Sequence, residues 1–252
     1  MMTFSELLQK RRAIRDFENK EVPLAIIQDI LQDATLAPSA SNNQPCRFAV
    51  VSCRKTIKAL SDESKANLLR DHAEKKIHLN PSYVNLLQDE NFNVFYNAPC
   101  VIYIVGPKSV GSLDVDAALA ASYIMLGAAA RGLGTCWVAL GANIRDPRLR
   151  AELGIPDTCR IVAPIILGHP KAIPAASERH APDILRVVTE ALVAVPHYFN
   201  VMEPGQVDGR DIRFCKWAQR HPVASQGTAQ CRNARNDRCA HVVRRSNCDH
   251  SL

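Results

Sequence analysis

The sequence predicts an α+β sandwich in which one β-sheet is covered by helices. Four short apolar, β-branched segments have the length of strands, and segments with helical periodicity lie between them. Two of the intervening regions are long, which argues against a regular βαβ array. With 252 residues, 47% hydrophobic and 22% charged, the chain can bury a sizeable core.

The N-terminal part is expected to hold helices around a first strand. Phe4–Arg12 has apolar residues at helical spacing, and a second apolar stripe starts at Pro23, a residue that fits the first turn of a helix. That helix ends before the loop Ala37–Pro45, which contains two prolines. Phe48–Ser52 is the first expected strand, and residues 54–96 are expected to be mostly polar and helical.

The following segments alternate strands and helices. Val101–Gly106 is an apolar strand. Asp114–Arg131 is a helix with small and apolar residues nearly all round, which is typical of a core or a subunit interface. Glycines stop this helix, and the strand Thr135–Leu140 follows. A short helix, Pro147–Leu153, then precedes the last strand, Ile161–Leu167.

Charge and composition separate the end of the chain from its body. Residues 1–202 hold 22 Lys and Arg against 20 Asp and Glu, whereas residues 203–252 hold 9 against 5. A nearly neutral body argues against nucleic acid as a partner. The end also lacks apolar periodicity and contains four of the nine cysteines. We therefore expect a main domain over residues 1–187 and an atypical, basic, disordered or loosely packed extension over residues 188–252.

The start of the chain and its apolar runs indicate a cytoplasmic protein that does not span a membrane. Residues 1–12 lack the apolar region and cleavage site of a signal peptide. The longest apolar run is interrupted by Ser122, Gly127 and Arg131. The odd number of cysteines argues against a complete disulfide framework and favours thiols in a reducing compartment.

An arginine cluster is the first candidate for chemistry. Arg11, Arg12 and Arg15 lie within five residues at a helix exit, with only Asp16 and Glu18 as nearby acidic residues. Guanidinium groups bind phosphate in a bidentate manner, so this cluster is a candidate phosphate site. The alternative is a solvated basic helix end, which the helix dipole favours at the C-terminus of a helix.

The loop before the first strand is the second candidate. Its small residues let the backbone approach a ligand, and Ser39, Asn42 and Gln44 offer donors and acceptors suited to a heterocycle edge. The alternative is an ordinary polar loop. The glycines of Gly132–Trp137 follow a helix and precede a strand, the reverse of a nucleotide-binding turn, so they are interpreted as a helix stop. No catalytic motif or metal-ligand spacing is found, so no catalytic residue and no metal site are assigned.

Four motifs taken in order resemble the nitroreductase family of flavoproteins over roughly residues 3–187. They are Arg11-Arg12-Ala13-Ile14-Arg15-Asp16-Phe17, Ala37-Pro38-Ser39-Ala40-Ser41-Asn42-Asn43-Gln44-Pro45, Gly132-Leu133-Gly134-Thr135-Cys136-Trp137 and Leu167-Gly168-His169-Pro170. The resemblance implies an α/β/α sandwich with a mostly antiparallel sheet, and a homodimer that holds FMN at its interface. It also implies ping-pong electron transfer from NADH or NADPH to a small acceptor, such as a nitroaromatic compound or a quinone.

The same resemblance implies which residues bind FMN. The phosphate and ribityl chain would be met by Arg11, Arg12, Arg15 and the backbone of Ala13. The partner subunit would supply Pro38, Ser39 and Ala40. The flavin would lie near Asn42, Gln44 and the backbone of Leu140 and Gly141, and Arg179 would close on the phosphate.

The chain departs from the family pattern at three places. Ala13 stands where Ser is common, Cys46 stands where Trp is common, and the sequence beyond Arg179 does not match the usual ending. Three alternatives to the redox enzyme remain. One is an FMN-binding protein without turnover, such as a flavin carrier or a flavin-fragmenting relative. The second is a module that binds nucleic acid through its basic end, and the third is a degraded homologue that no longer folds well.

Overall fold

The structure is a computed structural model that describes residues 3–188. The chain divides into two units, residues 1–178 and 179–252, and all described helices and strands lie in the first. The described part of the second unit, residues 179–188, has no helix or strand. Apart from residue 188, the predicted extension lies outside the described residues, so the expected boundary stays a prediction.

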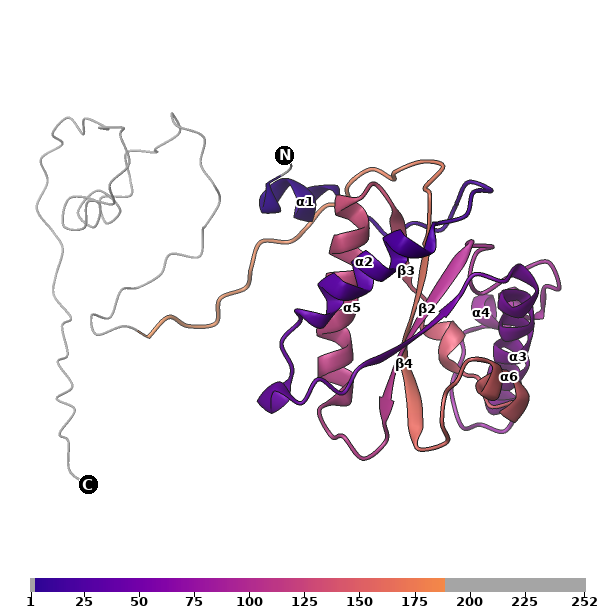
Figure 1. The fold of residues 1–252 in the computed structure, drawn as a ribbon. Helices are drawn as coiled ribbons and strands as arrows, with labels where there is room; N and C mark the ends of the chain where they lie inside the picture. Colours follow the sequence, from indigo (N-terminus) through magenta and orange to yellow (C-terminus); the bar gives the residue numbers. More distant parts are fainter. Residues whose placement is uncertain (1–2, 189–252) are drawn as a thin grey trace, which may run out of the picture. The chain divides into compact units, whose positions relative to one another are not determined.

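A four-stranded sheet forms the centre of the first unit (Figure 1). Its strands are β1 (Arg47–Val51), β2 (Cys100–Pro107), β3 (Gly134–Trp137) and β4 (Cys159–Gly168). They lie in the order β1-β2-β4-β3, and every neighbouring pair is antiparallel. This arrangement confirms the predicted α+β class and its antiparallel sheet.

Helices cover both faces of the sheet (Figure 1). On one face lie α2 (Leu24–Thr35) and α5 (Leu113–Ala130), with α1 (Phe4–Lys10) in contact with α5. On the other face lie α3 (Arg54–Ala73), α4 (Pro81–Gln88) and α6 (Pro147–Glu152). The layers therefore form the predicted α/β/α sandwich.

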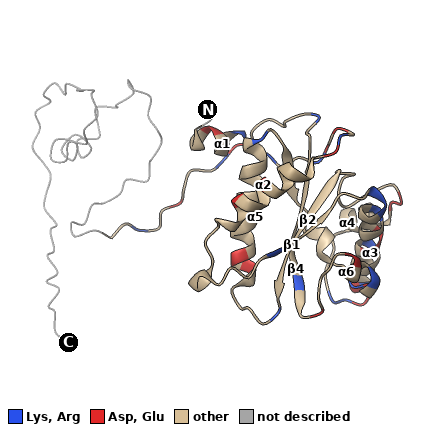
Figure 2. Ribbon diagram, viewed as in Figure 1, with Lys and Arg blue, Asp and Glu red and all other residues tan. Residues whose placement is uncertain are grey.

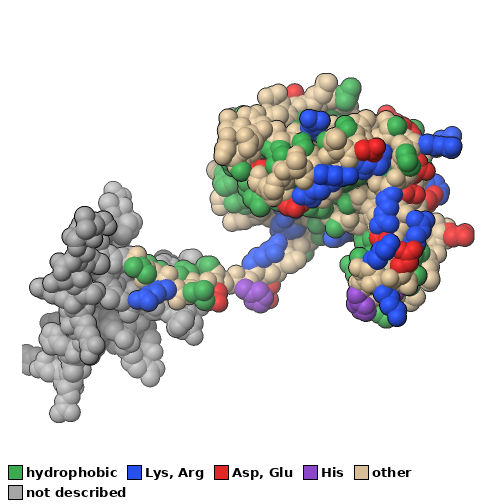
Figure 3. Space-filling view, turned by 90° about the horizontal axis from the view of Figure 1, so that it is seen from below, with side chains coloured by type: hydrophobic (Ala, Val, Ile, Leu, Met, Phe, Trp, Pro, Cys, Tyr) green, Lys and Arg blue, Asp and Glu red, His purple; other side chains and the backbone are tan. Residues whose placement is uncertain are grey.

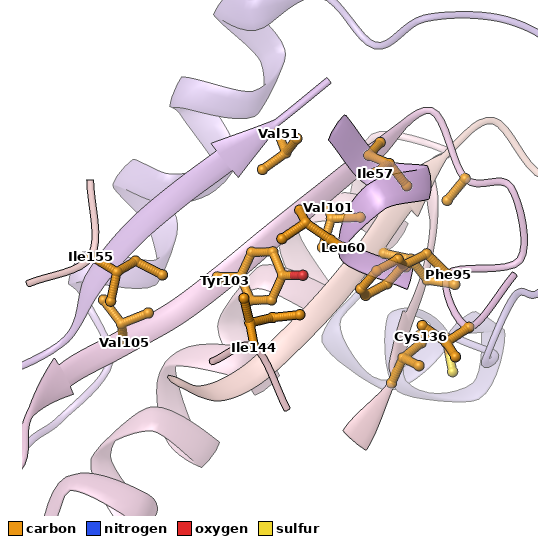
Figure 4. Packing of buried hydrophobic residues seen from close by; sticks show 14 of the residues in the cluster. Val51, Ile57, Leu60, Phe95, Val101, Tyr103, Val105, Cys136, Ile144 and Ile155 are labelled. Atoms are coloured by element: carbon orange, nitrogen blue, oxygen red, sulfur yellow. The ribbon is translucent and has the colours of Figure 1, made fainter. Parts of the chain in front are cut away.

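The pleat of β2 divides the core into two clusters. Ile102 and Ile104 pack with the α2 and α5 side, whereas Val101, Tyr103 and Val105 belong to the cluster on the α3 side. Successive strand residues point to opposite faces, and because both faces are covered, the whole strand is apolar. Figure 4 shows Tyr103 in the middle of the α3-side cluster.

Helix α5 has one face in the core and one face outside it. By length and composition alone it could cross a membrane. However, Ala117, Ala121 and Ile124 are fully buried against the sheet, as in the core helix of a globular domain. Val115, Leu119 and Tyr123, spaced four residues apart, form an exposed stripe on it.

The third strand is shorter than predicted. We expected Thr135–Leu140, but β3 ends at Trp137 and the chain enters the 3₁₀ turn η2 (Ala139–Ala142). The Gly141 N–H donates to the Val138 carbonyl at 2.9 Å, which bends the backbone out of the sheet. An apolar run cannot distinguish a strand from the tight turn that follows it.

Charged side chains are unevenly distributed on the first unit. Figure 2 shows many charged positions along α3 and α6 and fewer along α2 and α5. Figure 3 shows Lys and Arg mixed with Asp and Glu on the face that it presents. Charged positions are therefore less frequent on the helices of one face of the sheet than on those of the other.

Candidate functional site

The arginine cluster lies in an extended segment beside β3. Helix α1 ends at Lys10, and Ala13 then forms a parallel bridge with Thr135. The Ile14 N–H donates to the Thr135 carbonyl at 2.9 Å. Ile14 and Phe17 are buried, and Arg15 between them is exposed. The segment thus extends the sheet edge while keeping Arg15 outside the core.

The three arginines have different surroundings. Nη1 of Arg12 donates to the carbonyls of Gln9 and Arg11, the latter at 2.8 Å, so Arg12 caps the end of α1. The Arg15 guanidinium lies 5.8 Å from the centroid of the Tyr96 ring. Within residues 3–188, neither Arg11 nor Arg15 has a carboxylate within 4.0 Å. These two guanidiniums are therefore available to an anion, whereas Arg12 is largely engaged by the helix.

The pKa of the Cys136 thiol reflects the position of the arginines beside β3. Burial raises the pKa of Cys136 on β3 above its usual range, and the positive charges of Arg15 and Arg11 act in the opposite direction. Both arginines therefore lie close enough to β3 to influence its side chains. Cys136 itself is buried in the α3-side cluster.

The turn after β3 lies near the same place. A Cβ atom at Gly141 would lie 2.2 Å from Cε1 of Phe95, so the backbone of the turn packs directly on that ring. The next residue along the chain, Tyr96, is the ring that Arg15 covers. The Leu140 carbonyl accepts a hydrogen bond from Ser64 Oγ on α3. One protomer thus brings Arg15 and the turn η2 together around two adjacent aromatic rings.

The second predicted segment forms a strained loop. Ser41, Asn42 and Gln44 have φ of 50°, 54° and 46°, in the left-handed region that non-glycine residues rarely adopt. The Ser39 Oγ accepts from the Gln44 N–H at 2.9 Å, and Gln44 Nε2 donates to Asn42 Oδ1 at 3.0 Å. Clustered backbone strain of this kind is found at ligand clamps.

The structure does not place this loop next to the arginines of the same protomer. The Ala40 N–H donates to Asp116 Oδ1 at 2.9 Å, which places the loop at the N-terminal end of α5. The arginine segment borders β3, which follows the C-terminal end of the same helix. Helix α5 has 18 residues, so a rise of 1.5 Å per residue puts its two ends about 25 Å apart. Arg179 lies in the second unit and is exposed, so its predicted role stays a prediction.

Sequence reasoning did not find Phe95, Tyr96 and Ser64 as neighbours of the site. The available signal was a cluster of aromatic residues at the end of the otherwise polar stretch 54–96. A hollow of about 220 Å³ also opens between α3 and residues 90–98. None of the predicted site residues lines it.

Comparisons with known proteins agree with this fold. The Nitroreductase family model matches residues 8–169. A putative NADH dehydrogenase/NAD(P)H nitroreductase of Archaeoglobus fulgidus is 28% identical over 66% of this chain and 84% of its own. Human iodotyrosine deiodinase 1 is 27% identical over 73% of this chain and 65% of its own. A Bacteroides fragilis nitroreductase, solved with bound FMN, superposes with a TM-score of 0.63 at 20% identity, covering 73% of this chain and 97% of that one.

The extended arginine segment, the antiparallel sheet and the turn after β3 all lie within the matched residues. The chain belongs to the nitroreductase family.

Proposed function

We propose that this protein binds FMN between two copies of the chain and passes electrons from NADH or NADPH to a small oxidised acceptor. The observation that carries this proposal is the position of Arg11 and Arg15. Both lie beside β3 without a carboxylate partner in residues 3–188, and Arg15 covers a ring that adjoins the turn η2. Family membership supports the same function.

The residues present fit FMN. A phosphate would supply the negatively charged partner that Arg11 and Arg15 lack within residues 3–188. Guanidinium groups bind phosphate in a bidentate manner. The Arg12 Nε is buried without a partner in the described residues and is a further donor. The backbone of Ala13, Leu140 and Gly141 would lie beside the cofactor. When bound, FMN supplies the hydride chemistry, and the protein supplies position and charge.

The second copy completes the site. Because the 38–44 loop and the arginines lie at opposite ends of α5, the loop of one chain reaches the arginines only in another chain. A twofold arrangement with antiparallel α5 helices brings them together. The partner would then contribute Pro38, Ser39 and Ala40, with Asn42 and Gln44 near the ring.

The surface of α5 supports such a dimer. Val115 is 64% exposed, and Leu119 and Tyr123 continue its stripe. Phe4 and Leu8 of the neighbouring α1 are exposed as well. Pairing two copies through these residues would bury apolar surface.

A single open binding face would serve the donor and the acceptor in turn, which predicts ping-pong kinetics. The purified protein should be yellow, and its visible absorption should bleach when NADH or NADPH is added anaerobically. A nitroaromatic compound or a quinone should then restore it. A halogenated aromatic acceptor belongs in the same test, because a deiodinase is among the relatives. A yellow protein that neither donor bleaches would contradict the redox function and support FMN binding without turnover.

A further inference from the structure

Helix α3 buries polar residues where helices usually bury apolar ones. Ser61, Ser64, Lys65 and Asn67 are all buried, with Ser64 fully covered and Lys65 only 9% exposed. Burying hydroxyl, amide and ammonium groups costs free energy unless each finds a partner. All four find backbone partners outside the helix, which identifies them as a set.

Two of the four hold the segment that leads to the aromatic rings of the site. Lys65 Nζ donates to the Asp89 carbonyl at 2.6 Å and to the Phe92 carbonyl at 2.9 Å. Ser61 Oγ accepts from the Val94 N–H at 3.0 Å. The next residues along the chain are Phe95 and Tyr96. The conformation of residues 89–94 thus depends on α3.

The other two hold the turn after β3. Ser64 Oγ donates to the Leu140 carbonyl, and Asn67 Nδ2 donates to the Asn143 carbonyl at 2.9 Å. The peptide that follows Leu140 is planar and trans, so directing its carbonyl at α3 points the Gly141 N–H away from α3. The bonds therefore fix the orientation of the turn.

The two held segments meet at the site. Gly141 packs on Phe95, and Tyr96 lies under Arg15. The buried Lys65 ammonium has no carboxylate within 4.0 Å in residues 3–188. Apolar side chains of similar size would fill the same space without this desolvation cost. Packing alone does not account for a set of donors and acceptors aimed at two backbone segments.

We propose that Ser61, Ser64, Lys65 and Asn67 are positioning residues, which hold residues 89–94 and 140–143 in fixed register and thereby set the affinity and redox potential of bound FMN. The inference rests on the proposed function, because it assigns these residues a role toward the same cofactor. It adds α3, which supplies none of the predicted FMN contacts, to the machinery of the site.

The test compares Ser64→Ala and Lys65→Met with Thr56→Ala. Thr56 lies on the same helix, and its hydroxyl donates to Glu152 of α6 at 2.7 Å, so the control removes one α3 hydrogen bond that does not reach the site. In the intact protein, the FMN dissociation constant, the visible spectrum and the midpoint potential are measured. Loss of one hydrogen bond should weaken FMN binding about fivefold. A tenfold change in the preference for oxidised over reduced flavin would shift the potential by about 30 mV.

We expect both site-directed variants to change FMN affinity and either the potential or the flavin absorption bands, with Thr56→Ala like the wild type. Ser64→Cys keeps the shape of the side chain but has a weaker hydrogen-bond donor, so its FMN affinity should lie between those of Ser64→Ala and the wild type. This variant replaces Lys65→Met in the test if Lys65→Met does not fold. Wild-type affinity, spectrum and potential in Ser64→Ala and Ser64→Cys would overturn the inference, as would an equal effect of Thr56→Ala. A wild-type protein that binds no FMN would instead overturn the proposed function.

Discussion

The contact between the turn η2 and Phe95 gives a prediction with a definite size. In Gly141→Ala, the new Cβ would lie 2.2 Å from Cε1 and 2.7 Å from Cζ of the ring. Phe95 is fully buried, and its ring packs edge-on against Tyr103 at a centroid distance of 6.2 Å, so it has little room to move. Overpacking of this kind costs about 1–3 kcal/mol.

The free energy translates into a melting temperature that circular dichroism can follow. For a domain of this size, 1 kcal/mol corresponds to about 2–4 °C, so Gly141→Ala should lower Tm by roughly 2–12 °C. FMN content should fall with it, because the turn must shift. Gly111→Ala is the matched control, since a Cβ there would meet no atom within 4 Å.

A double-mutant cycle identifies the contact itself. Phe95→Leu removes the ring atoms that the new methyl group meets. Gly141→Ala combined with Phe95→Leu should therefore lose less stability than the two single variants together, by about 0.5–3 kcal/mol. Wild-type stability in Gly141→Ala, or strict additivity in the cycle, would refute the reasoning.

Three further predictions concern the cofactor, the dimer and pH. Arg15→Ala should weaken FMN binding about tenfold to a hundredfold in fluorescence titration, since a charged hydrogen bond contributes about 1.5–3 kcal/mol; full occupancy would contradict the assignment. Leu119→Glu should yield monomers without flavin in size-exclusion chromatography, and yellow monomers would exclude a shared site. The Arg145 guanidinium lowers the pKa of Asp71 below its usual range. The stabilisation that the ionised Asp71 contributes is therefore fully present above its unfolded-state pKa of about 4. It is lost as pH falls through the lower pKa of Asp71 in the folded state. Tm should then fall more steeply from pH 5 to pH 3 in the wild type than in Asp71→Asn, and equal slopes would contradict this.

Local patterns predicted the elements of the fold well. Apolar spacing located α2, α5 and the strands to within a few residues, because periodicity depends on neighbours along the chain. The strand order β1-β2-β4-β3 depends on pairing between distant segments, which periodicity does not encode. The antiparallel sheet was expected only through the family resemblance.

The site could be predicted only in part. The arginine cluster and the 38–44 loop are visible as local composition. Within residues 3–188, Arg11 and Arg15 of the cluster have no carboxylate within 4.0 Å, and the loop has left-handed backbone. The capping role of Arg12 and the position of Tyr96 under Arg15 are tertiary contacts without a local signal. The distance between the loop and the arginines appears only once α5 separates them in space.

The shared FMN site is tested most directly by a mixed dimer. Arg15→Ala and Ala40→Trp chains, carrying different affinity tags, are co-expressed and the heterodimer is purified through both tags. In the heterodimer, one FMN site would combine the altered arginine cluster of the first chain with the altered loop of the second. The other site would combine the intact arginine cluster of the second chain with the intact loop of the first. We predict one FMN per heterodimer and little FMN in either variant homodimer. A colourless heterodimer beside a yellow wild-type protein would contradict a site built from two chains.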